Sequence, residues 1–139
     1  MDQEKNPNED KKDYLKSYKK TRNRLNALEL QLNQIKIDIV HVRASQGDGL
    51  PRGKGETSDL SRYMEQMANL EEQIDNIRSE LVDKQIKITL AINNSLDDDD
   101  ECTVMTEKYL NCKTWEKVSE DNGFAWRTMH RIHGRALKK

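Results

Sequence analysis

Three arginines recur at intervals of four residues near the end of the chain: Arg127, Arg131 and Arg135. On a helix this interval places the side chains one above another on a single face. A guanidinium group holds its N–H donors in a fixed fork, which suits the paired acceptors of a phosphate or of a guanine edge. No Asp or Glu follows Asp121, so no acidic residue in this last segment offsets the charge. The pattern therefore predicts a basic helical face that contacts nucleic acid.

A helix-turn-helix unit would position that face. Two short helices that cross steeply need a small residue where they touch and a glycine in the turn between them, and Ser119 and Gly123 occupy these positions. The other packing positions carry apolar or capping side chains, namely Thr114, Trp115, Val118, Phe124, Met129 and Ile132. Because the second helix turns one side toward these residues, its other side stays free. We predict that this recognition helix begins at about Trp126.

The candidate DNA-binding residues form two groups. The first lies on the recognition helix and is assigned to base edges in the major groove or to adjacent phosphates: Trp126, Arg127, Thr128, His130, Arg131 and Arg135. The second is assigned to the sugar-phosphate backbone: Lys113, Lys138 and Lys139. Double-stranded DNA is therefore the expected partner.

The charge of the chain is divided unequally. The whole sequence is nearly neutral, with 24 Lys and Arg against 25 Asp and Glu. From Cys102 onward there are eight basic and four acidic residues, which leaves 16 against 21 in residues 1–101. A basic domain joined to an acidic body suits contact with phosphate at one end only. Charge alone also fits a solvated helix whose basic end complements its own dipole.

Residues that bind metals elsewhere are arranged differently here. The acidic run at residues 97–101 lacks the alternating ligands and central glycine of a calcium loop, so we interpret it as a linker and first helical turn. His130 and His133 lie three apart and, with Cys112, form a weak zinc candidate; an ordinary groove-facing or capping histidine explains them. Cys102 and Cys112 are too far apart for a Cys-x-x-Cys site and are expected to be reduced thiols. We expect no metal, no cofactor and no catalytic set, and hence no enzyme.

Two apolar seams run through the rest of the chain, with members spaced alternately by three and four residues. The first consists of Tyr18, Thr21, Leu25, Leu28, Leu32, Ile35, Ile39 and Val42. The second consists of Tyr63, Met67, Leu70, Ile74, Ile77, Leu81, Lys84, Ile88 and Ala91. Two helices with matching seams most simply fold back on each other as an antiparallel pair.

The predicted fold class is thus all-α. A long antiparallel helical hairpin, a coiled coil, occupies residues 13–95, and a C-terminal helix-turn-helix domain occupies residues 96–139. The glycines and Pro51 of residues 45–57 would break any helix, so this stretch is the predicted hairpin loop. Residues 1–12 are polar and contain Pro7, and we predict a disordered tail there.

The chain resembles known families in two stretches. The C-terminal stretch resembles the fourth region of sigma factors in Leu96-Asp97, Glu101, Val104-Met105, Tyr109-Leu110, Thr114–Val118, Gly123, Arg127–Met129 and Ala136-Leu137. The loop Gly47–Gly53, followed by Ser58–Leu60 between two long helices, extends this likeness to about Tyr14–Leu137. Over that length the chain is similar to phage and prophage late-transcription regulators of the ArpU and RinA type. It departs from them at Ala125, where the family has a capping Ser or Thr, and in the heavier acidic run at residues 97–100.

The resemblance implies a phage-encoded, sequence-specific regulator of transcription, acting on late genes in the cytoplasm of a bacterial host cell. We expect a homodimer through the helical hairpin, because paired half-sites add affinity and a two-helix core is small. No run of residues is long and apolar enough for a membrane span. Two alternatives are an RNA polymerase-binding adaptor with a sigma-like domain and a small-terminase-like DNA packaging protein, although the latter usually places its DNA-binding part first.

Overall fold

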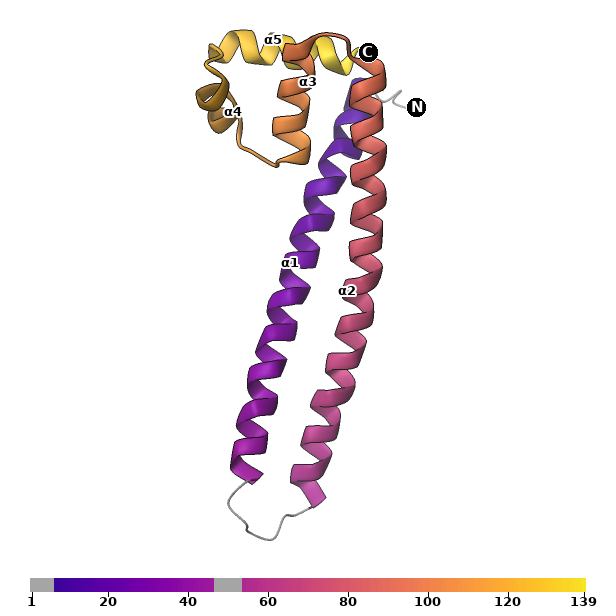
Figure 1. The fold of residues 1–139 in the computed structure, drawn as a ribbon, viewed down its shortest axis with the longest axis vertical. Coiled ribbons are helices and arrows are strands. Elements are labelled where there is room, and N and C mark those ends of the chain that lie inside the picture. Colours follow the sequence, from indigo (N-terminus) through magenta and orange to yellow (C-terminus); the bar gives the residue numbers. More distant parts are fainter. Residues whose placement is uncertain (1–6, 47–53) are drawn as a thin grey trace, which may run out of the picture. The chain divides into compact units, whose positions relative to one another are not determined.

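The computed structural model describes residues 7–46 and 54–139, which are all-helical and contain no strand. The helices are α1 (Pro7–Gln46), α2 (Lys54–Ser95), α3 (Asp99–Met105), α4 (Trp115–Asn122) and α5 (Trp126–Leu137), with a π-helical turn η1 (Thr106–Leu110) after α3 (Figure 1). They form two compact units, Asn23–Glu80 and the combination of Met1–Arg22 with Leu81–Lys139. Within the described ranges, no helix has an apolar stretch long enough to span a membrane.

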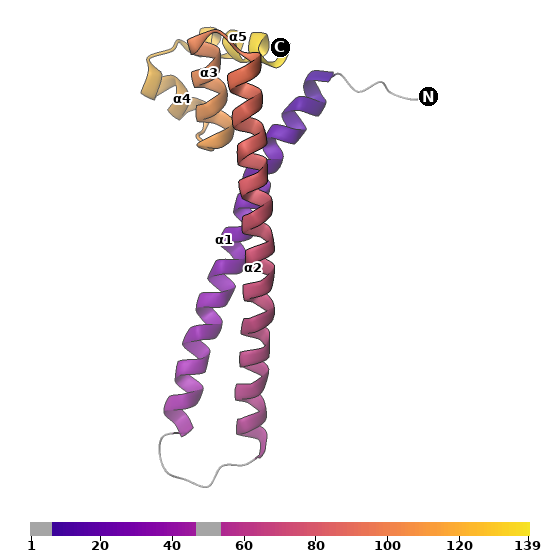
Figure 2. The same cartoon turned by 45° about the vertical axis from the view of Figure 1, so that its right-hand side comes forward.

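The unit Asn23–Glu80 consists of one stretch of α1 and one of α2, which lie side by side in both views (Figures 1 and 2). The Arg78 guanidinium donates to Glu29 Oε1 at 2.8 Å, while Arg43 lies 4.0 Å from Met64 Sδ. Residue 29 of α1 is thus paired with residue 78 of α2, and residue 43 with residue 64, so the two stretches run in opposite directions. Their common core is Ile35, Ile39 and Leu70, with Leu28, Leu32, Leu60, Tyr63 and Met67 packed against it. The apolar seams predicted from the spacing are confirmed here.

The other unit packs the N-terminal turns of α1 and the C-terminal turns of α2 against α3, η1 and α5. Its larger core consists of Leu15, Tyr18, Ile88, Ile92, Leu96, Met105, Tyr109, Ala136 and Leu137. Each fully buried aliphatic side chain of this kind contributes about 1.5–3 kcal/mol. Polar contacts add to it, since Lys84 Nζ donates to Thr21 Oγ1 at 3.0 Å. At the last seam position the expectation is wrong, because Ala91 is exposed and its neighbour Ile92 is buried.

The bounds of α1 and α2 differ from the predicted ones at two places. Residues 7–12 belong to α1, so the predicted disordered tail does not extend over them. Pro7 stands at the first helical position, where its missing N–H costs nothing, and Lys11 Nζ donates to the Leu137 carbonyl at 2.8 Å. Within the predicted loop 45–57, residues 45 and 46 belong to α1 and residues 54–57 belong to α2. Residues 1–6 and 47–53 lie outside the described part.

A second core joins α3, α4 and α5. Val104, Val118, Met129 and Ile132 are buried together, with Trp115 and Phe124 packed against them. The Thr114 hydroxyl begins α4 by accepting the Lys117 N–H at 3.2 Å. Gly123 ends it in the left-handed region at φ 67°, where its N–H donates to the Ser119 carbonyl. The Ser119 hydroxyl donates to the Phe124 carbonyl at 2.6 Å, so the packing and turn residues predicted from the sequence do meet.

Candidate nucleic-acid interface

Helix α5 begins without a side-chain cap. Ala125 has extended backbone angles, and its carbonyl accepts the Met129 N–H at 2.9 Å, yet it offers no side chain to the first turn. The first N–H groups of a helix have no partner within the helix, and the positive end of its dipole lies there. Such a terminus favours an anion. Because Ala125 has no hydroxyl to cap them, the first N–H groups of α5 are left without a side-chain partner from the cap residue.

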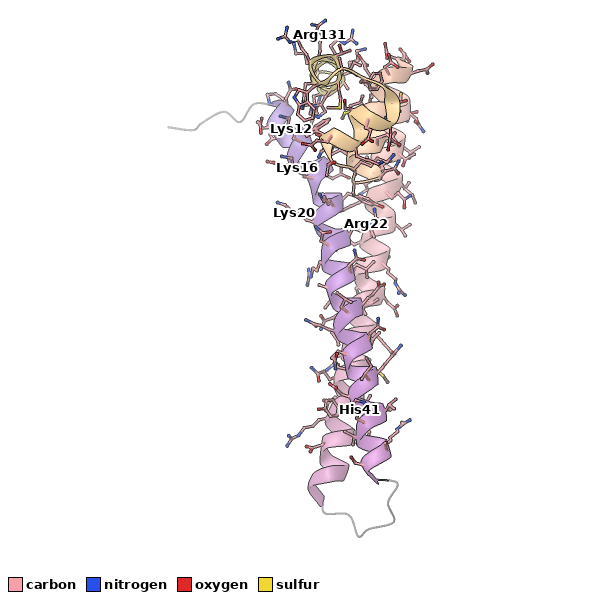
Figure 3. All side chains as sticks on the ribbon, turned by 90° about the vertical axis from the view of Figure 1, so that its left-hand side faces the viewer. Lys12, Lys16, Lys20, Arg22, His41 and Arg131 are labelled. Atoms are coloured by element: carbon pink, nitrogen blue, oxygen red, sulfur yellow. The ribbon has the colours of Figure 1, made fainter. Side chains whose placement is uncertain are left out.

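The two sides of α5 differ sharply in burial. The side facing the cores carries Met129, Ile132, His133, Ala136 and Leu137, all buried. The other side carries exposed Arg127, Thr128 and Arg131, together with Trp126, whose side chain is 49% exposed. Figure 3 shows Arg131 pointing away from the helices. Within the described ranges neither Arg127 nor Arg131 forms an ion pair, so both guanidinium groups are open to a partner.

A row of aromatic rings supports this exposed side. The His130 ring lies 4.7 Å from the Trp126 ring and 4.9 Å from the Trp115 ring, measured between centroids. Trp115 in turn contacts His133 edge to face at 4.6 Å. His130 is therefore half-buried between two indoles and holds Trp126 in place, which is a different position from the freely groove-facing one expected.

Two of the predicted cations already have a carboxylate partner. Lys139 Nζ lies 2.9 and 3.1 Å from the two carboxylate oxygens of Glu101, and Arg135 Nε lies 3.8 Å from one of them. Glu101 is only 1% exposed, so its charge requires these neighbours. Arg135 and Lys139, which the sequence predicts to contact DNA, are thus ion-paired with Glu101, and each stays about half exposed. These ion pairs tie the end of α5 to the start of α3.

Lys113 is also occupied. Its ammonium group forms ion pairs with Glu107 and, at 2.9 Å, with Asp121. These hydrogen bonds raise the pKa of Lys113, while those from Lys113 and Lys117 lower the pKa of Asp121. Lys113, which the sequence predicts to contact the DNA backbone, is therefore ion-paired within the protein. Lys138, by contrast, is exposed.

A buried polar pair under α5 was missed by the sequence reasoning. The Tyr109 hydroxyl and His133 Nε2 share a hydrogen bond at 2.6 Å, and His133 is only 6% exposed. Burial, reinforced by the positive charges of Lys12, His130 and Lys108, lowers the pKa of His133 to about 4. Burial likewise raises the pKa of Tyr109 to about 12. A usable signal existed, because position 133 falls on the buried helical spacing shared with Met129.

The acidic run does what a helix start requires. Asp98 Oδ1 accepts the N–H groups of Asp100 and Glu101 at 2.8 and 3.1 Å, which confirms the first-turn interpretation. Cys102 and Cys112 are free thiols, and burial followed by the charge of Asp99 raises the pKa of Cys102. Among the described residues, no group of three or more His, Cys, Asp or Glu could hold a metal ion.

The candidate interface is therefore the exposed side of α5 together with its N-terminus. It combines two guanidinium groups that form no ion pair with any described residue, the Thr128 hydroxyl, an exposed indole and an uncapped helix N-terminus. Guanidinium groups and helix N-termini both bind phosphate, and guanidinium groups also read guanine edges. Comparison of the chain with protein-family models, with curated proteins and with solved structures found no match.

Proposed function

We propose that this protein is a sequence-specific DNA-binding regulator of transcription that reads the major groove with α5. One observation carries the proposal: among the described residues, Arg127 and Arg131 on the exposed side of α5 form no ion pair, while the opposite side of α5 is buried against α3 and α4. This is the geometry by which a recognition helix is held against base edges. The combination of α4 and α5 is interpreted as a helix-turn-helix.

The residues divide by their contacts. Arg127 and Arg131 are assigned to guanine edges or to phosphates beside them, and Thr128 adjoins both. The uncapped first turn of α5 and exposed Lys138 are assigned to backbone phosphates. Trp126 lies at the same end and offers an apolar surface to a thymine methyl group or a sugar. Arg135 and Lys139 stabilise the position of α5 through their ion pairs with Glu101 of α3.

The biological assignment is a phage-encoded regulator of late genes, acting in the cytoplasm of a bacterial host. It rests on the resemblance to phage late-transcription regulators and to the fourth region of sigma factors, in residues such as Thr114–Val118 and Arg127–Met129. The positions of that resemblance that fall in α4 and α5 supply the cap, the buried core and the exposed arginine described above. The proposal includes no catalytic step.

The pairing of α1 with α2 is interpreted as an antiparallel hairpin that serves as a dimerisation element. Seam side chains such as Ile35 and Leu70 already pack against each other within the unit, so a second copy would meet other residues. Val82, Ile86 and Leu90 recur every four residues on α2, and each is more than half exposed. Such an apolar stripe suits a second helix of the same kind. A dimer would present two recognition helices to paired half-sites.

Binding of the purified protein to fragments of its phage genome tests the function. We expect one upstream fragment to bind tightly and its affinity to fall steeply as salt rises, because phosphate contacts release counterions. Light scattering on the same sample gives the mass and thus the number of copies. Binding that ignores the fragment and the salt concentration would instead favour the polymerase-docking adaptor.

Variants of α5 localise the contact. Arg127→Ala and Arg131→Ala are each expected to lose about 1–3 kcal/mol of specific binding energy, the usual worth of a good base contact. The matched control is Arg62→Ala, which removes an exposed arginine of α2 that forms an ion pair with Asp59 on the same helix. Equal affinity of all three variants for the fragment would contradict the assignment of α5 as the recognition helix.

A further inference from the structure

A second basic feature lies apart from the exposed side of α5. Within the unit formed by Met1–Arg22 and Leu81–Lys139, a cavity of about 320 Å³ opens between α1, η1 and α5. Its walls are Lys12, Lys16, Lys108, Tyr109, Trp115, His130 and His133. Three of these residues are lysines, two are histidines, and none is a carboxylate. The cavity thus combines positive charge with aromatic surface.

The lysines reach the cavity from two elements. Lys108 stands on η1, a π-helical turn whose hydrogen bonds join residues five apart instead of four, as from the Asn111 N–H to the Thr106 carbonyl. The Lys108 ammonium lies 4.8 Å from the centre of the Trp115 ring and donates to the Lys113 carbonyl at 3.4 Å. Lys12 and Lys16 come from the first turns of α1, one helical turn apart. The cations therefore converge on one space from different sides.

Two carboxylates have a recorded interaction with the cavity lysines among the described residues. Glu9 lies 3.7 Å from Lys12 on the same helix, and Glu116 is the acidic neighbour of Lys108. Against them, burial and the positive charges of Lys19 and Lys16 lower the pKa of Lys108. The depressed pKa of His133 beside the same lysines has the same origin, after burial. The positive charges of these lysines therefore repel one another, and a bound anion would reduce that repulsion.

The basic surface continues along α1. Lys20 follows Lys12 and Lys16 at the same interval of four, and Figure 3 shows the three one below another along the helix. A row of ammonium groups at one-turn intervals matches a chain of phosphates better than it matches one isolated carboxylate. The Trp115 ring beside the row offers a face for a base or a sugar.

We propose that the cavity between α1, η1 and α5 binds a phosphate group through Lys12, Lys16 and Lys108, beside the Trp115 ring. The same chemistry has two sources, a backbone phosphate of DNA or a free phosphorylated small molecule. The site goes beyond the proposed reading of bases by α5 and does not depend on it. It gives the first turns of α1 a function that a disordered tail would not have.

Titration of the full-length protein with inorganic phosphate tests the site. The Trp126→Phe variant leaves Trp115 as the single tryptophan, so its fluorescence reports the cavity. With chloride adjusted to hold the ionic strength constant, we expect a saturable change in emission. Lys16→Ala and Lys108→Ala are each expected to weaken the binding about tenfold, because each removes one charged hydrogen bond. The matched control is Lys87→Ala, which removes an exposed lysine of α2 outside the cavity and keeps the affinity.

Absence of a saturable change, or unchanged affinity in both cavity variants, would overturn the proposal. Titration of a short random duplex across a salt series then separates the two sources. If DNA supplies the phosphate, Lys16→Ala lowers the slope of log affinity against log salt by about 0.9. If phosphate binding is lost but duplex binding is unchanged, the ligand is a free phosphorylated molecule. The preference for one DNA fragment, which tests α5, is measured separately from phosphate binding in the cavity, so failure of the α5 proposal is recognised separately.

Discussion

The ion cluster around Glu101 allows a sharp test of what the end of α5 does. The Glu101 side chain is 2% exposed, whereas the side chains of its partners Lys139 and Arg135 are 49% and 55% exposed. Removing a cation leaves a buried charge behind, but removing the carboxylate leaves two cations that reach water. The two changes should therefore differ in cost although they break the same ion pair.

The magnitude follows from the exposures. Loss of one partner from a fully buried pair costs about 3–5 kcal/mol. Because Lys139 is half-exposed and Arg135 remains 3.8 Å from the carboxylate, we reduce this to about 1–3 kcal/mol for Lys139→Met. Glu101→Gln keeps a polar group in place and is expected to cost about 1 kcal/mol or less. The double variant should be more stable than the sum of the two losses predicts.

Urea unfolding followed by tryptophan fluorescence is the assay, because both tryptophans, Trp115 and Trp126, report on the domain that α5 completes. Lys138→Met is the matched control, since Lys138 is exposed and adjacent in sequence, and it should change stability by less than about 0.5 kcal/mol. Equal losses for Lys139→Met and Lys138→Met, with no coupling to Glu101, would refute the view that Lys139 is a structural cation.

Two further predictions concern backbone and protonation. Gly123→Ala should destabilise the domain by about 1–2 kcal/mol because φ is 67° there, although an added Cβ has free space. Gly134→Ala within α5 should instead stabilise the domain by about 0.5–1 kcal/mol, because alanine favours the helix more than glycine does. Thermal melts that give the same sign for both variants would contradict this. Since the pKa of His133 falls from 6.5 to about 4 on folding, stability is present above about pH 6.5 and is lost as pH falls toward 4, by up to roughly 3 kcal/mol. Urea unfolding at several pH values should show a smaller acid loss in His133→Gln, and an equal loss would count against a neutral buried imidazole.

The long helices and their buried faces could be predicted because they follow local rules. Seam positions such as Ile35, Ile39 and Leu70 are buried as their spacing predicts. The turn at Gly123 and the cap at Thr114 were equally accessible, since each depends on a residue type at a fixed distance from a helix end. Even the missing cap at Ala125 could be stated from the sequence.

The occupied cations could not be predicted in the same way. Arg135 and Lys139 meet Glu101 only through the tertiary fold, and a count of charges along the chain cannot tell a paired lysine from a free one. The cavity lysines were missed for a related reason. Lys12 stands in a polar stretch whose helix depends on packing against a distant part of the chain, as the bond from Lys11 to the Leu137 carbonyl illustrates.

The central claim is that the exposed side of α5 reads DNA. The most direct measurement is the salt-dependent affinity of the wild-type chain and of the Arg127→Ala, Arg131→Ala double variant for the upstream fragment it binds best. We predict that the double variant keeps the fold and its residual affinity for random DNA but loses its preference for that fragment. A double variant that still prefers the fragment as strongly as the wild-type chain would contradict the account.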